Sequence, residues 1–460
     1  MRDTGFLGRE PIGRLLLKLS LPAMVGMLVQ ASYNIVDAFF IGRGVGSMGL
    51  AGTAVAFPFQ FFVMGIATLG GVGAASLVSR SLGAGDIEQA DRALGTLVTM
   101  ALATGLATAV LGRAYLPGLL ALLGARGEIY PYAEAYLGVI LFGAPFQVLG
   151  AGLNNVVRAE GNARIAMLTM VISALANVVL DPLFIFGFGW GIAGAAWATV
   201  LAQVMVVVWL GAYHISGYSA LKLKAGHMLP RAGILGRIVA VGASEFARLS
   251  ATSVTAALVV HSLSRFGSPM AVAAYGVVHR VLSLVFMPIM GVSQGLQPIL
   301  GYNYGAGAWG RAHRAIRLSV AAATAISGSA FLVLLLFPGL VFGIFTTDPA
   351  LRVLGSRALR LMTLGFALIG FQVIGSTIFQ AMGKAVPAFI LSMSRQVLMF
   401  LPILLLLPRF LGLDGVWLSF PVADALAFLV TFLFFNRQMR ELCRLETGPA
   451  CEGEPEGENP

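Results

Sequence analysis

Residues 161–199 read GNARIAMLTMVISALANVVLDPLFIFGFGWGIAGAAWAT, an almost wholly apolar stretch in which Asp181 is the only acid. A second apolar stretch, LPAMVGMLVQASYNIVDAFFIG over residues 21–42, contains Asp37 as its only acid. A carboxylate near the centre of a lipid-spanning helix costs roughly 2.5–3.5 kcal/mol, so it usually faces a partner, a cavity or an ion path. The two acids therefore mark either a functional site or a structural hydrogen bond between helices, and the second half of the chain offers no matching pair.

The composition is typical of a membrane protein that spans the bilayer many times. Of the 460 residues, 58% are hydrophobic and only 11% are charged, which is far outside the range of soluble domains. The first ten residues are polar and no small-residue cleavage pattern follows them, so we expect the first apolar helix to stay in the protein. The two cysteines, Cys443 and Cys451, do not have the spacing of metal ligands.

The basic residues are distributed unequally between alternate loops. The net charge of +10 could suggest nucleic acid, but lysine and arginine lie in short loops between apolar runs, so we expect the bilayer and no nucleic acid as partner. Of the 30 lysines and arginines, 19 lie in one set of loops, 8 lie in the other set and three lie inside apolar runs. By the positive-inside rule, both termini are cytoplasmic and the protein lies in the cell (inner) membrane with an even number of spans.

The chain divides into twelve apolar runs of the length that a bilayer requires. They lie near residues 15–42, 50–78, 92–112, 131–157, 164–187, 190–214, 234–263, 270–300, 313–340, 354–381, 385–407 and 413–436. We therefore predict an all-α membrane protein. Its expected parts are an N-lobe (1–214), a cytoplasmic linker (215–233), a C-lobe (234–440) and a disordered acidic tail (441–460).

The two groups of six runs are copies of each other. The Gly-Ala-Gly run at 83–85 recurs at 305–307, Gly143 recurs as Gly365, and Gly161 recurs as Gly383, all at an offset of 222 residues. A repeat with six spans crosses the membrane in the same direction as its copy, so the copies are related by a pseudo-twofold axis along the membrane normal. This predicts two pseudo-symmetric six-helix bundles around a central cleft, an architecture usual in alternating-access transporters.

The segments 21–42 and 161–199, together with the repeated Gly-Ala-Gly loops, resemble the multidrug and toxic compound extrusion family, specifically its DinF-like branch. The resemblance covers all twelve runs, and its most specific part is Asn-x-x-x-Asp-Pro followed by Gly-x-x-Gly-Ala-Ala-x-Ala-Thr. It implies an antiporter that exports amphipathic, often cationic compounds in exchange for inward H⁺ or Na⁺. It implies no enzyme activity and no cofactor other than that coupling cation.

Several polar residues of the first half share one face and one depth. Asn177 and Asp181 are four residues apart and so lie on one helix face. Pro182 removes a backbone donor beside the acid. In the first run, Gln30, Tyr33 and Asp37 form one helical stripe. Thr199 and Tyr136 reach a similar depth from antiparallel helices.

The resemblance places the family's cation-coupling and substrate site, or a Na⁺ site, on Asp37, Asp181, Asn177 and Thr199. It places Tyr33, Gln30, Tyr136 and Asn154 around that site, although the position of Asn154 in its run puts this residue near the inner end. Two acids in a poorly solvated pocket cannot both stay ionised at low cost. They can share one proton, or they can bind Na⁺ with oxygens from Asn177 and Thr199, and the donor set does not discriminate between the two ions.

A transport cycle follows from this site. Binding of H⁺ or Na⁺ from outside neutralises the acids and changes the bend of the first span, where Pro22 and Gly26 provide a weak point. The cationic compound then leaves, and the lobes rock to open inward. Pro22, Glu245 and Arg280 are the residues that we expect to contribute to gating.

Charged residues of the second half are expected to pair with one another. Glu245 and Arg248 are three residues apart and form an ion pair near the inner end of their span. We expect Arg280 and Arg395, like His279, to be buried bases, with Asp424 as counter-charge for one of them. The tenth run contains Gln372 but no acid, which argues against a second Na⁺ site in the C-lobe.

Two other functions fit parts of the sequence. A lipid-linked oligosaccharide flippase of the same superfamily would use arginines in the central cleft, for which Arg248, Arg280 and Arg395 are the candidates. A membrane enzyme would need a metal cluster, a catalytic triad or a phosphate-binding loop at membrane depth, and no such motif is present. We expect a monomer that binds small amphipathic organic substrates.

Overall fold

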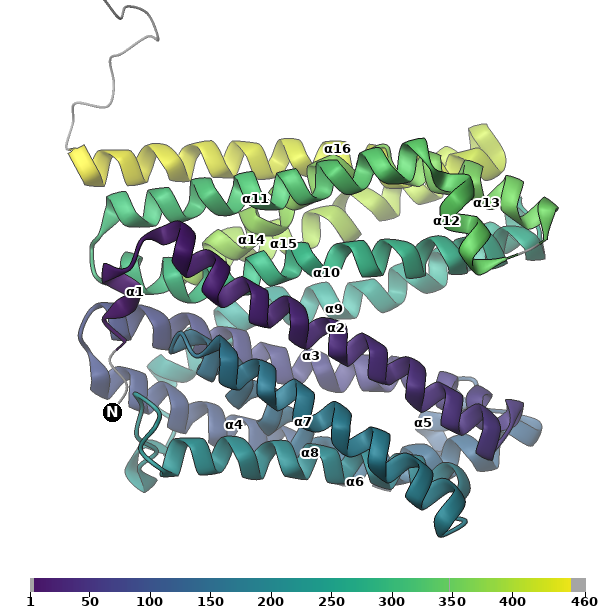
Figure 1. The fold of residues 1–460 in the computed structure, drawn as a ribbon, viewed down its shortest axis with the longest axis horizontal. Helices are drawn as coiled ribbons and strands as arrows, with labels where there is room; N and C mark the ends of the chain where they lie inside the picture. The colour runs from purple at the N-terminus through teal and green to yellow at the C-terminus, as the bar shows by residue number, and fades with distance from the viewer. Residues whose placement is uncertain (1–3, 347, 448–460) are drawn as a thin grey trace, which may run out of the picture.

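The apolar runs of the sequence form long helices that lie side by side (Figure 1). The structure is a computed structural model that describes residues 4–346 and 348–447, and over these residues it contains helices and no strand. The helices of the first half are α1 (Phe6–Arg9), α2 (Ile12–Gly44), α3 (Ser47–Gly83), α4 (Ile87–Ala114), α5 (Leu116–Leu122), η1 (Gly127–Ile129), α6 (Tyr130–Ala159), α7 (Ala163–Pro182), η2 (Leu183–Gly187) and α8 (Gly191–Ile215). The linker contains η3 (Ala225–His227). The helices of the second half are α9 (Ala232–Phe266), α10 (Pro269–Gly305), α11 (Trp309–Leu336), α12 (Pro338–Phe345), α13 (Pro349–Thr363), η4 (Phe366–Leu368), α14 (Ile369–Met382), α15 (Ala385–Met393), η5 (Ser394–Met399) and α16 (Phe400–Thr447).

The helices supply the twelve passes that the sequence predicts. Among the described residues, ten helices are long and apolar enough to cross a membrane, and the bent pair of α13 with η4 and α14 raises the number to 11. The last of these, Ala385–Glu446, has 62 residues, about three times the length that a bilayer requires. It turns back at Gly412, whose φ of 58° is in the left-handed region that favours glycine. Counted as two passes, this segment brings the total to twelve.

The two halves of the chain form two lobes, with α3, α4, α6, α7 and α8 in the lower part of Figure 1 and α10 to α16 in the upper part. One end of the molecule carries α1 and the turns after α3 and α10, and we call it the α1 end. The opposite end carries α5, α12 and α13, and we call it the α13 end (Figure 1). These names do not depend on the orientation of the protein in the membrane.

Helix α2 belongs to both lobes. Its first half, represented by Leu15 and Leu19, is buried in a hydrophobic core with Val292 and Ile316 of the second half of the chain. Its second half packs on α7 of the N-lobe. Figure 1 shows α2 in purple as it crosses diagonally from the helices of the C-lobe to α7. The predicted N-lobe begins at residue 1, but the apolar side chains in the first half of α2 pack in the core of the other lobe.

Helix α9 repeats this arrangement in the opposite direction. Ile238, near its start, is buried in the core that α3 and α4 form in the N-lobe. Val259 and Leu263, near its end, are buried in a core of the C-lobe. Each lobe thus sends the first half of its first long helix into the other lobe, which is the exchange expected of two related copies.

The copies also meet across a reciprocal crossing of α3 and α10 at the α1 end. A Cβ added at Gly83 would collide with the backbone carbonyl of Tyr302, and one added at Gly305 would collide with the carbonyl of Arg80. Both pairs are related by the 222-residue offset, so the repeat seen in the sequence is also a repeat of packing. Only a residue without a side chain lets the two backbones approach this closely.

The last helix is longer than the sequence predicts. Residues 441–447, which were expected to begin a disordered tail, continue α16 to Thr447. Leu442 is fully buried, and Lys384 Nζ lies 2.7 Å from a carboxylate oxygen of Glu441, so this end of the helix has contacts that a polar tail would lack. The rest of the expected tail, residues 448–460, lies outside the described residues.

The close approach at Gly305 predicts a loss of stability when a methyl group is added. Gly305→Ala should lower the free energy of unfolding by about 1–3 kcal/mol, because the added carbon must displace backbone atoms in a packed crossing. The measurement is thermal unfolding of the purified protein in detergent. The control is Gly328→Ala, because a Cβ at Gly328 meets no atom within 4 Å. Equal melting temperatures for the two variants would contradict the proposed role of the crossing.

Candidate functional site

The packing of α2 on α7 brings the two acids of the first half together. Asp37 is partly buried on α2, and Asp181 on α7 is 1% exposed. Their carboxyl groups lie within hydrogen-bonding reach of each other. Because two carboxylates offer only acceptor atoms, this contact requires either a proton on one of them or a cation between them.

Three of the four carboxylate oxygens of this pair are buried without a donor among the described residues. Asp37 Oδ1 and both carboxylate oxygens of Asp181 are buried and accept no hydrogen bond from the part of the chain that the structure describes. Asn177 Oδ1 is likewise buried without a donor among the described residues. The amide nitrogen of the same side chain donates to the carbonyl of Ser173 at 2.9 Å. Buried acceptors without a donor are costly. The arrangement of hard oxygen atoms therefore fits a shared proton or Na⁺.

The helix changes its winding directly after Asp181. Helix α7 ends at Pro182, and the next five residues, Leu183–Gly187, form a π-helical turn. Proline cannot donate the hydrogen bond that an α-helix requires at this position, and π-helical turns are frequent at functional sites. The weakened helix predicted from Pro182 is thus present next to the acid.

Two tyrosines complete the polar surroundings of the acids. Tyr33 of α2 lies close enough to Asp37 and Asp181 to interact with their charges. Tyr136 of α6 lies close enough to interact with both acids and with Tyr33. The hydroxyl of Tyr136 accepts a hydrogen bond of 3.1 Å from Gln60 Nε2 on α3. Gln60 is not among the residues predicted from the sequence, although an amide in the apolar run 50–78 is a signal of the same kind as Gln30.

The remaining candidates of the first half lie at different distances from this cluster. Gln30 is seven residues before Asp37 on α2, about 10 Å along the helix axis. The hydroxyl of Thr199 donates to the carbonyl of Ala195 on its own helix at 3.1 Å. Asn154 is not brought to the acids.

Asn154 instead links two helices near the α1 end. Its side-chain nitrogen donates to the carbonyl of Ala166 at 3.0 Å. Ala166 is near the start of α7, about 22 Å along the helix from Asp181. This agrees with the position that Asn154 has in its apolar run and not with the place that the family resemblance implies.

The second half of the chain neutralises its own acids. Glu245 and Arg248 form the predicted ion pair, with Arg248 Nε 3.0 Å from Glu245 Oε2. Arg395 Nε lies 2.6 Å from Asp424 Oδ1, so Asp424 is the counter-charge of one of the three bases, as predicted. Its backbone carbonyl also accepts a hydrogen bond of 2.8 Å from Gln372.

The prediction that Arg280 and His279 are buried is wrong. Both side chains are exposed on α10, because this part of the helix is covered on one face only, where Val278 and Val281 are buried. The residues around them are apolar, so the sequence does not reveal which face of the helix is covered. Neither residue is placed against an acid by the contacts that the structure describes.

A buried glutamate that the sequence analysis missed holds the linker between the lobes. Glu160, at the end of α6, is 2% exposed. Its carboxylate accepts a hydrogen bond of 2.8 Å from the Ser219 hydroxyl, one of 3.2 Å from the Tyr213 hydroxyl and one of 3.0 Å from the backbone of Ala220. The sequence does offer a signal for this residue, because Glu160 is an acid directly before the Gly-Asn turn that ends an apolar run. These contacts make Glu160 a structural residue of the linker.

Comparison with known proteins agrees with this architecture. The MatE family model matches residues 22–183 and 246–405. The multidrug export protein MepA of Staphylococcus aureus (strain MRSA252) is 27% identical over 448 residues, which cover 97% of this chain and 98% of the relative.

Solved structures resemble the whole chain. A MATE structure in the bent conformation has a TM-score of 0.91 with 27% sequence identity and covers 96% of this chain and 99% of its own. An outward-facing multidrug resistance MATE family transporter of the MOP superfamily has a TM-score of 0.89, also with 27% identity, over 96% of this chain and 99% of its own. The matched family segments cover both lobes, including both helices that carry the paired acids, and the protein therefore belongs to the MatE family, as a multi-pass membrane transporter and not an enzyme.

Proposed function

We propose that this protein exports small amphipathic compounds, including organic cations, in exchange for inward movement of H⁺ or Na⁺. The pairing of Asp37 with Asp181, with buried acceptor oxygens that lack donors, carries this proposal. A purely structural role does not explain two facing acids. Apolar residues could hold the two helices together equally well, because replacing a buried polar pair by apolar residues is often neutral or stabilising. The name multidrug export protein, given to a relative of similar length, supports the same activity.

The coupling of the two ligands follows from charge. When the acid pair holds no ion, it attracts a cationic compound, and when it holds H⁺ or Na⁺, this attraction is lost. The hard oxygens of Asp37, Asp181 and Asn177 would hold Na⁺, with Thr199 of α8 as a further ligand that the family resemblance implies. Binding of H⁺ or Na⁺ from outside thus favours release of the bound cationic compound, and this competition is the basis of exchange.

The direction of transport follows from the distribution of basic residues. The α1 end carries the majority of the lysines and arginines, so we place it, with both termini, in the cytoplasm of a cell whose inner membrane holds the protein as a monomer. The lobes contact each other at this end, where Ser76 donates to the carbonyl of Gln380 and Arg158 donates to Gln294. The described state is then closed towards the cytoplasm.

Movement between states centres on the middle of α2. Pro22 and Gly26 lie where this helix passes from the C-lobe core to α7, and Gly26 packs closely on Met170 of α7. A proline inside a helix removes one backbone hydrogen bond, so the second half of α2, with Asp37, can change its bend while the first half stays in the C-lobe core.

The flippase alternative is weakened by the ion pairs of the second half. Arg248 and Arg395 are engaged by Glu245 and Asp424, so neither guanidinium is free to hold a pyrophosphate. Arg280 alone is a weak basis for recognition of a large anionic headgroup.

Removal of either acid should abolish coupled transport. In proteoliposomes, Asp37→Asn and Asp181→Asn should each reduce efflux of a fluorescent organic cation by about tenfold or more, because the coupling free energy between ion and substrate is lost. The matched control is Asp86→Asn, since Asp86 caps α4 by accepting from the Gln89 backbone and asparagine caps equally well. Wild-type transport in both variants would exclude the site.

The identity of the coupling ion is tested with imposed gradients. Vesicles that contain the wild-type protein receive a pH gradient without Na⁺, or a Na⁺ gradient at constant pH, and substrate efflux is recorded. Efflux should follow at least one gradient and should lose its response to that gradient in Asp37→Asn. Transport driven by Na⁺ alone would exclude proton coupling, and transport independent of both gradients would contradict the proposed exchange.

The bend of α2 is tested by Pro22→Ala. The substitution restores a backbone donor and favours a straight helix, so we expect substrate binding to be kept while the transport rate falls several-fold. Binding is measured by quenching of substrate fluorescence, and transport is measured in the same vesicles as above. An unchanged rate would show that the bend of α2 does not limit the cycle.

A further inference from the structure

Helix α13 concentrates positive charge at the end of the molecule where positive charge is otherwise scarce. Of the 8 basic residues in the loops of the α13 end, three lie within residues 352–360. They are Arg352, Arg357 and Arg360. The transport cycle described above uses none of them, and the positive-inside rule favours their absence from this end. This accumulation of charge calls for a separate ligand.

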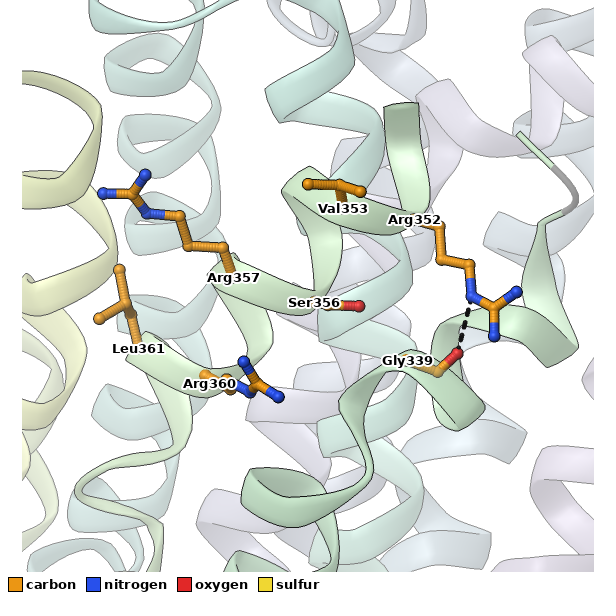
Figure 2. Close-up of a pocket in the computed structure, with 7 residues that line it drawn as sticks. All are labelled: Gly339, Arg352, Val353, Ser356, Arg357, Arg360 and Leu361. Atoms are coloured by element: carbon orange, nitrogen blue, oxygen red, sulfur yellow. Dashed lines mark hydrogen bonds between the residues drawn. The ribbon is translucent and has the colours of Figure 1, made fainter. Parts of the chain in front are cut away.

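The arginines are sorted onto two sides of the helix. Arg352, Ser356 and Arg360 are spaced by four residues and so share one face, whereas Arg357 points to the other side (Figure 2). A cavity of about 580 Å³ lies against this helix, and its walls include Gly339 of α12 and Val353 and Leu361 of α13. Three guanidinium groups and one hydroxyl of α13 line the cavity, and one of the three, that of Arg357, is turned away from the other two.

The internal partners of these groups leave donors free. Arg357 is paired with Asp414 at 2.5 Å. Arg352 donates its Nε to the carbonyl of Gly339 at 3.0 Å (Figure 2). Over the part of the chain that the structure describes, the side chains of Arg360 and Ser356 have no hydrogen-bond partner. The nearest acid in sequence, Asp348, is engaged as the cap of α13 and accepts from Ala350 at 2.9 Å.

The free donors are of the kind that bind phosphate groups, and they are spread over about 12 Å along the axis of α13. A guanidinium presents a planar fork of donors that matches phosphate oxygens, and a hydroxyl adds a further donor. Guanidinium forks and a hydroxyl along one helix face can bind the oxygens of an anionic headgroup.

The surroundings of the cavity are apolar and exposed. Val353, on the cavity wall, is 74% exposed, and Leu340 and Ile344 on α12 are 66% and 81% exposed. Exposed apolar groups on a membrane protein contact acyl chains. A free anion would not need them, whereas a phospholipid supplies both a phosphate for the arginines and chains for the apolar side chains.

We propose that the cavity between α12 and α13 binds the phosphate of an anionic phospholipid through Arg352, Ser356 and Arg360, with its acyl chains against Leu340 and Ile344. Bound lipid would hold α12 against α13, and the other end of α13 meets η4 and α14 at a bend of 42°. The site is separate from the acid pair in the N-lobe and does not depend on which ion drives transport.

The test compares lipids that differ in headgroup charge. Purified full-length protein in mild detergent is mixed with phosphatidylglycerol, with phosphatidylcholine, or with inorganic phosphate, and bound lipid is counted by native mass spectrometry while thermal unfolding is recorded. We expect phosphatidylglycerol to bind and to raise the melting temperature by several degrees, and Arg352→Gln and Arg360→Gln each to weaken its binding about fivefold, from the typical attraction of one arginine near anionic lipid.

The matched control is Arg126→Gln, an exposed arginine at the same end of the N-lobe, which should bind phosphatidylglycerol as the wild type does. Melting temperatures in phosphatidylcholine show whether the variants are folded. Three results would overturn the proposal: equal binding of both lipids to the wild type, full binding of phosphatidylglycerol to the double variant Arg352→Gln/Arg360→Gln, or stabilisation by inorganic phosphate that lipid does not increase.

Discussion

The packing of α2 into two cores is the constraint on which the rest of the structure depends. The first half of the helix is buried with Val292 and Ile316 of the C-lobe, and the second half lies on α7 and carries Asp37 to Asp181. A change in the angle between the lobes therefore acts on α2 at the point where it changes partners, near Pro22. Burial of apolar side chains supplies the free energy that fixes each half, while the weakened backbone between them permits movement.

The two lobes share an architecture and differ in how they treat acids. In the C-lobe, Glu245 is paired with Arg248 and Asp424 is paired with Arg395, so each buried acid already has a permanent counter-charge. In the N-lobe, Asp37 and Asp181 face each other, and their buried oxygens have no protein donor among the described residues. Only the N-lobe pair is left without a fixed counter-charge among the described residues, which supports our proposal that ion coupling is concentrated in one copy of the duplicated fold.

The two ends of the molecule serve different purposes. At the α1 end, glycine permits the reciprocal crossing of α3 and α10, and Glu160 holds the linker to the N-lobe. At the α13 end, exposed arginines and apolar side chains lie together on α12 and α13. The lobes are thus joined at the α1 end, and short surface helices with exposed side chains lie at the α13 end.

The sequence by itself determined the twelve passes, the duplication and the pairing of Glu245 with Arg248. The length of an apolar run, the offset of a repeat and the spacing along a helix can all be read along the chain without knowledge of the packing. Family resemblance added the candidate site, but it could not separate Asn154 from that site. Only the tertiary structure decided that Asp37 meets Asp181, that Arg280 is exposed, and that half of α2 belongs to the opposite lobe. The physical reason is that these outcomes depend on which helix faces bury each other, and packing between segments more than a hundred residues apart leaves no local pattern in the chain.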